Sequence, residues 1–280
     1  MKKIKLAFQG EKGAYSHIAC EEIFKDAEIK NCKTFEETFK TVFDDESYKA
    51  IIPIENSLAG RVADIHYLLP KFKLQIYGEH FQKVEHCLLC RNEAELKDIK
   101  YVRSHAQAIG QCQEIIKKNN FKSIISADTA GSAKDLAASN DNSIAAIASE
   151  LAAETYGLKI LKKNIEDEVG NVTRFLVMGK NTNQLEYDKN KKYITTCIFR
   201  LKSEASALYK SLGGFATNQI NLTKLESFSV KNSFEQVNFY LDLEGHIEQK
   251  SVQKSLEELG FHTESLDILG IYEASAFRQK

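Results

Sequence analysis

Residues 101–138, YVRSHAQAIGQCQEIIKKNNFKSIISADTAGSAKDLAA, contain the pattern that decides the fold. Two short runs, Tyr101–Ser104 and Ser123–Ser126, have the length and composition of β-strands. A helical pattern follows each run, Gln107–Lys117 after the first and Thr129–Ala138 after the second. Alternating strands and helices predict an α/β fold, in which helices form layers around a largely parallel sheet.

The same alternation extends from the N-terminus to about residue 180. Further predicted strands are Ile4–Phe8, Ala50–Ile54 and Ser143–Ala148, and further predicted helices are Ser16–Phe24, Thr34–Phe43 and Glu150–Tyr156. Several of these helices begin with a Ser or Thr that can cap the first turn. Residues 179–192 are then polar and rich in Lys and Asn, a composition typical of a linker. We therefore expect one domain over residues 1–180 and a second over residues 193–280.

The second domain has a different order of elements. Its predicted strands are Tyr193–Leu201, Ile220–Val230, Gln236–Leu243 and Glu264–Ile271, and its predicted helices are Ala205–Phe215 and Val252–Leu259. This order is βαββαβ, which is typical of a ferredoxin-like module. A fold of this kind assigns no function by itself.

The composition excludes several classes of protein. Of the 280 residues, 43% are hydrophobic and 28% are charged, which is typical of a globular chain and excludes intrinsic disorder. The 38 basic and 39 acidic residues give a net charge of -1, so the chain has no overall basic character suited to nucleic acid. No apolar run approaches the ~20 residues that span a bilayer, and the polar residues 9–12 follow the first apolar run directly. We expect a cytoplasmic protein that binds neither nucleic acid nor a membrane.

The six cysteines are scattered, which favours reduced thiols over a disulfide framework. Cys87 and Cys90 form a CxxC pair with His80 and His86 just upstream, and this spacing raises the alternatives of a zinc site or a redox pair. However, two leucines make residues 87–90 a continuous apolar run, which indicates a buried strand. No second CxxC or HxxxH supplies further ligands, so we favour the buried strand and expect no metal.

Polar side chains follow several of the predicted strands, at the sheet edge where α/β proteins hold ligands. The longest such segment is Pro53–Arg61, in which Glu55, Asn56 and Ser57 are adjacent; the alternative is a capped helix start. Gly10–Ser16 after the first strand predicts either an anion-binding turn or a plain βα turn.

Residues 171–175, NVTRF, place a Thr hydroxyl beside an Arg at the start of a strand. Such a pair can donate a proton while it grips a carboxylate with two hydrogen bonds. The alternative is a solvated Arg on an edge strand, and the spacing alone does not separate the two.

Together these segments resemble a known family. The matching motifs occur in order: GxxGxYS at Gly10–Ser16, PIENSxxG at Pro53–Gly60, SHxQAxxQC at Ser104–Cys112, DTAxxA at Asp128–Ala133, AAIAS at Ala145–Ser149 and NxTRF at Asn171–Phe175. The first domain resembles prephenate dehydratase. The second resembles the regulatory ACT domain of that enzyme, through Ala207–Tyr209, Ile220–Thr223, Glu226–Ser227 and Leu243–His246. Because no chorismate mutase segment precedes Met1, we expect the monofunctional form.

The resemblance implies a fold and an activity. The catalytic domain would consist of two α/β lobes, like a periplasmic binding protein, with the active site in the cleft between them. The substrate would be prephenate and the product phenylpyruvate, a step of L-phenylalanine biosynthesis, with no metal and no cofactor. L-phenylalanine would be an effector, and pairing of ACT domains would produce a homodimer or a homotetramer.

The resemblance also assigns roles to residues. Thr173 would donate a proton to the departing ring hydroxyl or orient it, Arg174 would bind a substrate carboxylate, and Phe175 would wall the ring and exclude water. Glu55 is the alternative acid. Hydrogen bonds to the substrate would come from Asn56, Ser57, Ser104, Gln107 and Thr129. His105 lies in a matched motif, but as a cap or surface residue it is given no catalytic role.

The sequence departs from the family pattern at four positions. Ala106 replaces a usual proline, which would loosen that turn. The expected regulatory residues are Ser206, Ala207, Leu208, Asn221 and Leu222. Ser206 stands where the family has glycine, and Phe228-Ser229 stands where it has Arg-Pro. We therefore expect inhibition by phenylalanine to be weaker than is usual in the family.

Three other functions stay open. Arogenate dehydratases use the same motifs on an amino-acid substrate. A catalytically silent amino-acid sensor is a second alternative, although it would not need the hydroxyl of Thr173. A structural scaffold is a third, and it leaves the polar strand ends unexplained.

Overall fold

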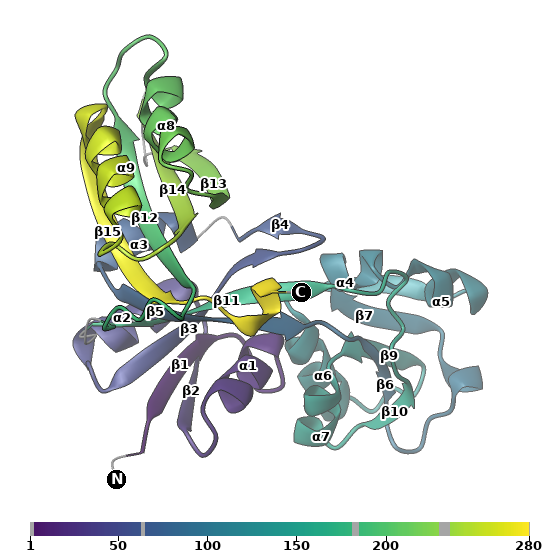
Figure 1. Cartoon of the computed structure of the whole chain (residues 1–280). Coiled ribbons are helices and arrows are strands. Elements are labelled where there is room, and N and C mark those ends of the chain that lie inside the picture. Colours follow the sequence, from purple (N-terminus) through teal and green to yellow (C-terminus); the bar gives the residue numbers. More distant parts are fainter. Residues whose placement is uncertain (1–2, 63–64, 181–184, 230–235, 280) are drawn as a thin grey trace. The chain divides into compact units, whose positions relative to one another are not determined.

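The alternation of apolar and polar residues produces the strands and helices drawn in Figure 1. The computed structural model describes residues 3–62, 65–180, 185–229 and 236–279. The chain divides into two units: Met1–Thr41, Ala50–Val62 and His80–Phe175 form unit 1, and Val42–Lys49, Ala63–Glu79 and Leu176–Lys280 form unit 2. Each unit therefore combines segments that are far apart in the sequence.

The first sheet of unit 1 begins with two parallel strands, β1 (Lys5–Gln9) and β2 (Glu28–Cys32), joined through α1 (Tyr15–Ile23). After α2 (Phe35–Asp44), β3 (Tyr48–Asn56) lies on the other side of β1, and β11 (Val172–Gly179) lies beside β3. The short strand β4 (Gly60–Arg61) pairs antiparallel with the end of β3. The end of β3 and the start of β11 thus lie side by side.

The second sheet of unit 1 has the strand order β10-β6-β9-β7-β8. Its strands are β6 (Cys87–Cys90), β7 (Tyr101–His105), β8 (Lys122–Ser126), β9 (Ile144–Ala148) and β10 (Lys159–Lys162). β7 runs parallel to β8 and to β9, whereas β6 runs antiparallel to both β9 and β10. Only β6 is reversed, so the prediction of a largely parallel sheet is confirmed here.

Helices cover both faces of the second sheet. Two hydrophobic clusters result, one with α4 (Ala106–Gly110) and α5 (Gln113–Lys118), the other with α6 (Thr129–Ala138) and α7 (Glu150–Tyr156). Because side chains alternate along a strand, Cys90 packs in the first cluster and Cys87 in the second. The buried strand predicted for the CxxC pair is therefore confirmed, and its two thiols lie on opposite faces of the sheet.

The helix predicted over residues 107–117 is wrong as a single helix, because it is broken after Gly110. The Asp167 carboxylate accepts hydrogen bonds from the backbone N–H groups of Gln113 (2.7 Å) and Glu114 (3.0 Å), and these contacts cap the start of α5. The Asp167 N–H donates to the Gln111 carbonyl at 2.7 Å. A distant loop thus ends α4 and starts α5, and Gln111 lies in the break.

Unit 2 contains the predicted βαββαβ order. The elements are β12 (Tyr193–Leu201), α8 (Ala207–Thr217), β13 (Leu222–Ser229), β14 (Val237–Glu244), α9 (Lys250–Phe261) and β15 (Thr263–Glu273). Adjacent strands are antiparallel in the order β13-β14-β12-β15, and α8 and α9 cover one face (Figure 1). The core beneath these helices includes Phe199, Phe215 and Leu241. Val230, predicted to end a strand, and residues 181–184 of the predicted linker lie outside the described residues.

Two elements of unit 2 come from earlier in the sequence and were not predicted. These are α3 (Ile65–Phe72) and the first part of β5 (Gln75–Lys83). β15 pairs with β5 at Gly270 and Ile76, where a Cβ on Gly270 would lie 1.9 Å from the Ile76 carbonyl oxygen. Only glycine permits this approach. From α3, the fully buried His66 packs its ring against Phe228, at 5.3 Å between ring centres.

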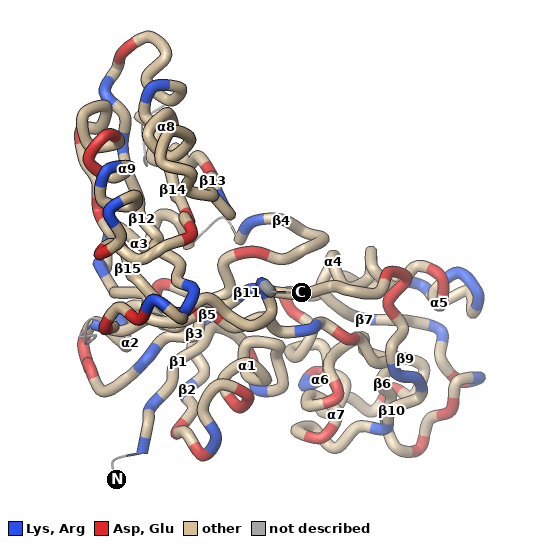
Figure 2. The backbone as a smooth tube through the Cα atoms, viewed as in Figure 1, with Lys and Arg blue, Asp and Glu red and all other residues tan. Residues whose placement is uncertain are grey.

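Charged residues of both signs are interspersed along the chain rather than gathered in separate stretches (Figure 2). Within the described part of the chain, no helix is both long and apolar enough to cross a membrane.

Candidate active site

Asn56, at the end of β3, is held by the turn that follows it. Its Oδ1 atom accepts hydrogen bonds from the backbone N–H groups of Leu58 (3.1 Å) and Ala59 (2.9 Å). Because these N–H groups can only donate, the amide oxygen must face the turn and the NH2 group must face β11. The NH2 group lies 2.7 Å from Asn171 Oδ1 and 2.9 Å from Thr173 Oγ1.

Thr173 is the second residue of β11 and is half-buried. Its Oγ1 atom accepts the hydrogen bond from Asn56, so that contact leaves the hydroxyl proton of Thr173 available for donation. This geometry suits the donor role expected of Thr173, which stays a prediction.

Arg174 lies on the opposite face of β11 from Thr173, because successive strand residues point to opposite sides. Its side chain is 2% exposed, and its Nη1 atom lies 3.0 Å from Glu55 Oε1. The expectation that Thr173 and Arg174 act side by side on one ligand is therefore corrected. The alternative acid, Glu55, is held in this ion pair.

Two of the serines expected to contact substrate are engaged with backbone instead. Ser57 accepts a hydrogen bond from the Val172 N–H (3.0 Å) and donates to the Gly170 carbonyl (3.3 Å), which joins the end of β3 to the start of β11. Ser104 is fully buried and donates to the Ile147 carbonyl at 2.7 Å, which joins β7 to β9. The structure thus assigns both hydroxyls to strand connections.

The remaining predicted residues occupy helix starts and the sheet. Gln107 is an exposed residue of α4, and Thr129 is the half-buried first residue of α6. His105 caps α4, since its Nδ1 atom accepts a hydrogen bond from the Gln107 N–H at 3.3 Å, and the predicted capping role is confirmed. Phe175 is 1% exposed within β11.

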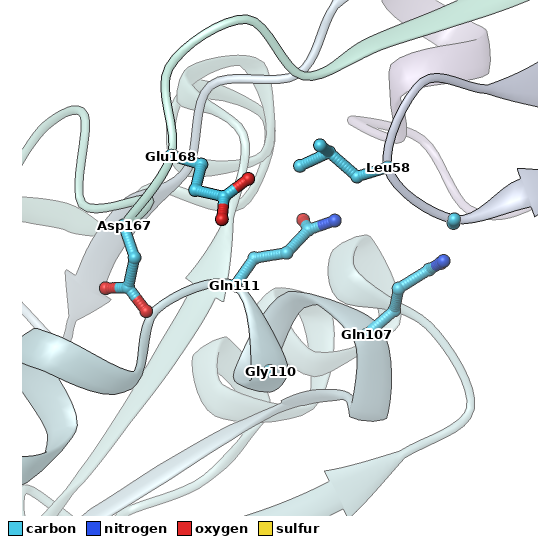
Figure 3. A pocket seen from close by; sticks show the side chains of 7 residues that line it. Leu58, Gln107, Gly110, Gln111, Asp167 and Glu168 are labelled. Atoms are coloured by element: carbon cyan, nitrogen blue, oxygen red, sulfur yellow. The ribbon is translucent and has the colours of Figure 1, made fainter.

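A pocket of about 440 Å³ lies beside the turn that follows Asn56 (Figure 3). Its lining comes from the β3–β4 turn, from α4 and from the loop before β11: Leu58, Ala59, Gln107, Gly110, Gln111, Asp167 and Glu168. In Figure 3 the Gln111 NH2 group points toward the open space near Leu58, whereas the Asp167 carboxylate turns away from it. The lining thus offers amides and an acidic group to a small ligand.

Gln111 was not chosen from the sequence, although it lies in the SHxQAxxQC motif. The helical pattern predicts an ordinary residue within a continuous helix. The break between α4 and α5 places Gln111 in the pocket. Its Oε1 atom lies 3.0 Å from Asn171 Nδ2 and 3.0 Å from His86 Nε2. The motif itself was the available signal.

His86 and Tyr15 lie behind Gln111. His86 is 2% exposed, and burial lowers its pKa, against smaller opposing effects of the Gln111 hydrogen bond and the Glu166 charge. The Tyr15 hydroxyl lies 2.9 Å from His86 Nδ1 and 2.8 Å from the Glu85 carbonyl oxygen. Burial raises the pKa of Tyr15 well above its ordinary value. At neutral pH the imidazole is therefore uncharged and the phenol carries its proton.

The Gly10–Ser16 turn approaches protein backbone. Gly13 has a φ of 87°, and a Cβ there would lie 2.6 Å from the Ala152 Cα in α7. Ser149 donates a hydrogen bond to the Gly13 carbonyl. Of the two alternatives for this segment, the structure favours a packed βα turn.

Comparisons with known proteins agree with one another. A family model described as prephenate dehydratase matches residues 6–183. The chain is 42% identical over 275 residues to a bifunctional N-acyl-homoserine lactone acylase/prephenate dehydratase of Komagataeibacter europaeus. The matched region covers 98% of each chain. It is 36% identical over 279 residues to arogenate dehydratase/prephenate dehydratase 2 of Arabidopsis thaliana, which covers 96% of this chain and 73% of that protein.

A solved structure gives the same result. The prephenate dehydratase of Arthrobacter aurescens, in complex with L-Phe, superposes with a TM-score of 0.88 at 27% identity, over 99% of this chain and 92% of that one. The chain belongs to the prephenate dehydratase family. The family resemblance expected from the six motifs is confirmed, as is the α/β fold class.

The residues expected to be regulatory lie in two groups. Ser206, Ala207 and Leu208 lie at the start of α8, and Asn221 and Leu222 follow its end. At 1.5 Å per residue, this helix of 11 residues is about 16 Å long. The regulatory role of both groups stays a prediction.

Proposed function

We propose that the chain is a prephenate dehydratase, which converts prephenate to phenylpyruvate with loss of carbon dioxide and water. The observation that carries this proposal is the Thr173 hydroxyl. Asn56 donates to its oxygen at 2.9 Å, so its proton is available to an oxygen of a bound ligand. Membership of the prephenate dehydratase family supports the same reaction.

The reaction breaks two bonds of the substrate ring. The bond between the ring and its carboxylate breaks, and its electron pair enters the ring as carbon dioxide leaves. The bond between the opposite ring carbon and its hydroxyl breaks, and the departing oxygen takes up a proton to leave as water. Formation of an aromatic ring drives both steps. Thr173 donates to the departing oxygen, and solvent restores the proton afterwards.

Arg174 has a positioning role in this proposal. The guanidinium is buried and paired with Glu55, so it holds β3 against β11 from the face opposite Thr173. This contact fixes Asn56, which follows Glu55 in β3, and Thr173, which precedes Arg174 in β11. Substrate carboxylates would accept hydrogen bonds from the Gln107 and Gln111 amides of the pocket.

The test is direct. Purified protein is incubated with prephenate at neutral pH, and formation of phenylpyruvate is followed with and without EDTA. We expect turnover in both cases, and double replacement of Cys87 and Cys90 by alanine should preserve it. Absence of phenylpyruvate, with the protein shown to be folded, would reject the proposal.

Arogenate is the alternative substrate, and Glu168 is the observation that favours it. This exposed carboxylate lines the pocket, where it would attract the ammonium group of arogenate and repel the two carboxylates of either substrate. Comparing kcat/KM for the two substrates decides between them. Glu168→Gln should shift the ratio toward prephenate, and Glu114→Gln, an exposed change on α5, is the matched control.

Acylase activity is a second candidate function. Its support is the relative of Komagataeibacter europaeus, whose name includes N-acyl-homoserine lactone acylase and which matches 98% of this chain at 42% identity. Incubation with N-acyl-homoserine lactones and detection of the released fatty acid tests it. If Thr173→Val abolishes prephenate turnover and spares acyl release, the two activities use different groups.

Residues 193–280 are proposed to act as an ACT domain that responds to phenylalanine, with residues 1–180 as the catalytic domain. The βαββαβ order supports this, as does the L-Phe complex of the related Arthrobacter aurescens enzyme. Phe228, which replaces the family arginine, is 5% exposed and packs on His66, so inhibition should be weaker than in the family. Calorimetric titration with phenylalanine and inhibition of turnover at the same concentrations test this, and micromolar binding with full inhibition would contradict it.

Phenylalanine acts on turnover only if it binds two states of the protein differently. The two regulatory groups at opposite ends of α8 would then need a second copy of the chain to complete one site. We accordingly propose a homodimer or homotetramer, which light scattering during size-exclusion chromatography would measure.

A further inference from the structure

Six polar side chains in unit 1 form one continuous run of hydrogen bonds, and one of them, Gln111, lines the pocket. In order they are Thr173, Asn56, Asn171, Gln111, His86 and Tyr15. The heavy-atom distances along the run lie between 2.7 and 3.0 Å. The proposed reaction uses Thr173 and the Gln111 amide, and it assigns nothing to His86 and Tyr15.

The direction of the bonds that lead from Asn56 to His86 follows from the orientation of Asn56. The Leu58 and Ala59 N–H groups can only donate, so they fix Asn56 with its oxygen toward the turn and its NH2 group toward Asn171. Asn171 must then accept through Oδ1 and donate through Nδ2. A reversed Asn171 would place two NH2 groups 2.7 Å apart, which is repulsive.

The same reasoning continues inward from Asn171. Because Asn171 donates, the Gln111 atom that it meets must be the oxygen, and His86 Nε2 lies 3.0 Å from the same oxygen. The Nε2 atom must therefore carry a hydrogen. On the other side of the ring, Nδ1 lies 2.9 Å from the Tyr15 hydroxyl oxygen, and the Tyr15 hydroxyl donates to the Glu85 carbonyl. The turn after Asn56 thus requires a hydrogen on Nε2 of a histidine 30 residues further along the chain.

This polarity determines what the pocket offers to a ligand. With two donors on its oxygen, Gln111 turns its NH2 group toward the open space of the pocket (Figure 3). Thr173, which accepts from Asn56, likewise keeps its proton for the ligand. Donors suit the carboxylates and the departing hydroxyl of prephenate, whereas a reversed Gln111 would turn an oxygen toward them.

We infer that His86 is a positioning residue, which holds Gln111 with its NH2 group toward the substrate. The inference rests on the proposed function for the identity of the ligand. His86 supplies the second donor to the Gln111 oxygen. The Glu166 carboxylate accepts from the His86 backbone N–H at 2.9 Å and fixes the position of the residue.

The kinetic test compares two replacements of His86. The amide nitrogen of His86→Gln can donate to Gln111, whereas His86→Leu has no donor. We expect kcat/KM for prephenate to fall by about three- to tenfold in His86→Leu, the factor of one ordinary hydrogen bond, mainly through KM. His86→Gln should recover most of the loss. Equal losses in both variants would overturn the inference.

The matched control is Tyr156→Phe, because the Tyr156 hydroxyl donates to the Lys12 carbonyl at 2.9 Å outside this run. The control should keep the kinetics of the original chain.

A spectroscopic measurement separates this inference from the proposed function. In protein labelled with ¹⁵N-histidine, the resonances of His86 are identified by their disappearance in His86→Gln. Hydrogen on Nε2 is expected whether or not the protein turns over prephenate. An Nε2 atom without hydrogen would overturn the assigned polarity, while absence of turnover with hydrogen on Nε2 would reject only the proposed reaction.

Discussion

The candidate active site of unit 1 and the βαββαβ module of unit 2 are built in different ways. The module follows the local pattern of the sequence, and each of its helices packs on strands adjacent to it in the chain. The site is assembled by contacts between residues more than 100 positions apart, such as Asn56 with Thr173 and Glu55 with Arg174. Local patterns therefore determine the module, whereas a few long-range polar contacts determine the site.

The largest expected effect tests the site side of this comparison. Thr173→Val keeps the shape of the side chain and removes the donor, so kcat should fall by roughly 10²–10⁴, the range of a positioned proton donor. Thr173→Ser restores a hydroxyl and should be partly active. Steady-state kinetics with prephenate measures both variants, and thermal unfolding checks that they remain folded. Turnover of the Val variant near that of the original chain would transfer the donor role to another group.

The next effect concerns stability and compares one ion pair from each unit. Arg174→Met should lower the free energy of unfolding by about 3–5 kcal/mol, because it leaves the Glu55 carboxylate without its buried partner. The control is Lys191→Met, which breaks the exposed pair with Glu273 in unit 2 and should cost at most about 1 kcal/mol. Urea unfolding measures both.

A double variant sharpens the same comparison. Glu55→Leu combined with Arg174→Met replaces both charges by apolar groups and should recover most of the lost stability. It should not recover activity, because the connection between β3 and β11 is then no longer polar. Equal stability losses in Arg174→Met and Lys191→Met would show that the Arg174 pair has no special role.

The sequence was sufficient for most of the fold and for part of the site. It predicted the elements of the βαββαβ module because apolar periodicity is a local property. It did not predict the break after Gly110, since the Asp167 carboxylate that caps α5 lies 54 residues away from Gln113. It also grouped Arg174 with Thr173, although successive residues of a strand point to opposite faces of the sheet. Arg174, Ser104 and Gln111 each have a side-chain partner on a distant segment, which local patterns do not reveal.

A smaller effect is expected in the module. Ser206, the residue before α8, has φ 63° and ψ 19°, a left-handed conformation that costs a residue with a Cβ roughly 1 kcal/mol. Ser206→Gly should therefore stabilise the protein by up to about 0.5 kcal/mol, after allowing for the greater freedom of glycine in the unfolded chain. Ser203→Gly, an exposed change three residues earlier, is the control and should not stabilise. Urea unfolding measures both variants. Equal shifts of the two unfolding midpoints would contradict the strain assigned to Ser206.

The smallest effect concerns pH and lies in unit 1. Burial lowers the pKa of His86 and of His17, in the latter case against the opposing charge of Glu21. In the unfolded chain both groups take up protons near the ordinary value of about 6.5, whereas the folded protein takes them up only at lower pH. Below about pH 6.5 the unfolded state therefore binds more protons, so stability is full above that pH and falls as pH decreases toward the folded pKa values.

Urea midpoints at pH 7.5, 6.5 and 5.5 should fall less steeply in His86→Gln than in the original chain. The slope should also be shallower in His17→Gln, since burial lowers the pKa of His17 in the same direction. Identical slopes in all three proteins would show that neither histidine contributes to the loss of stability at low pH.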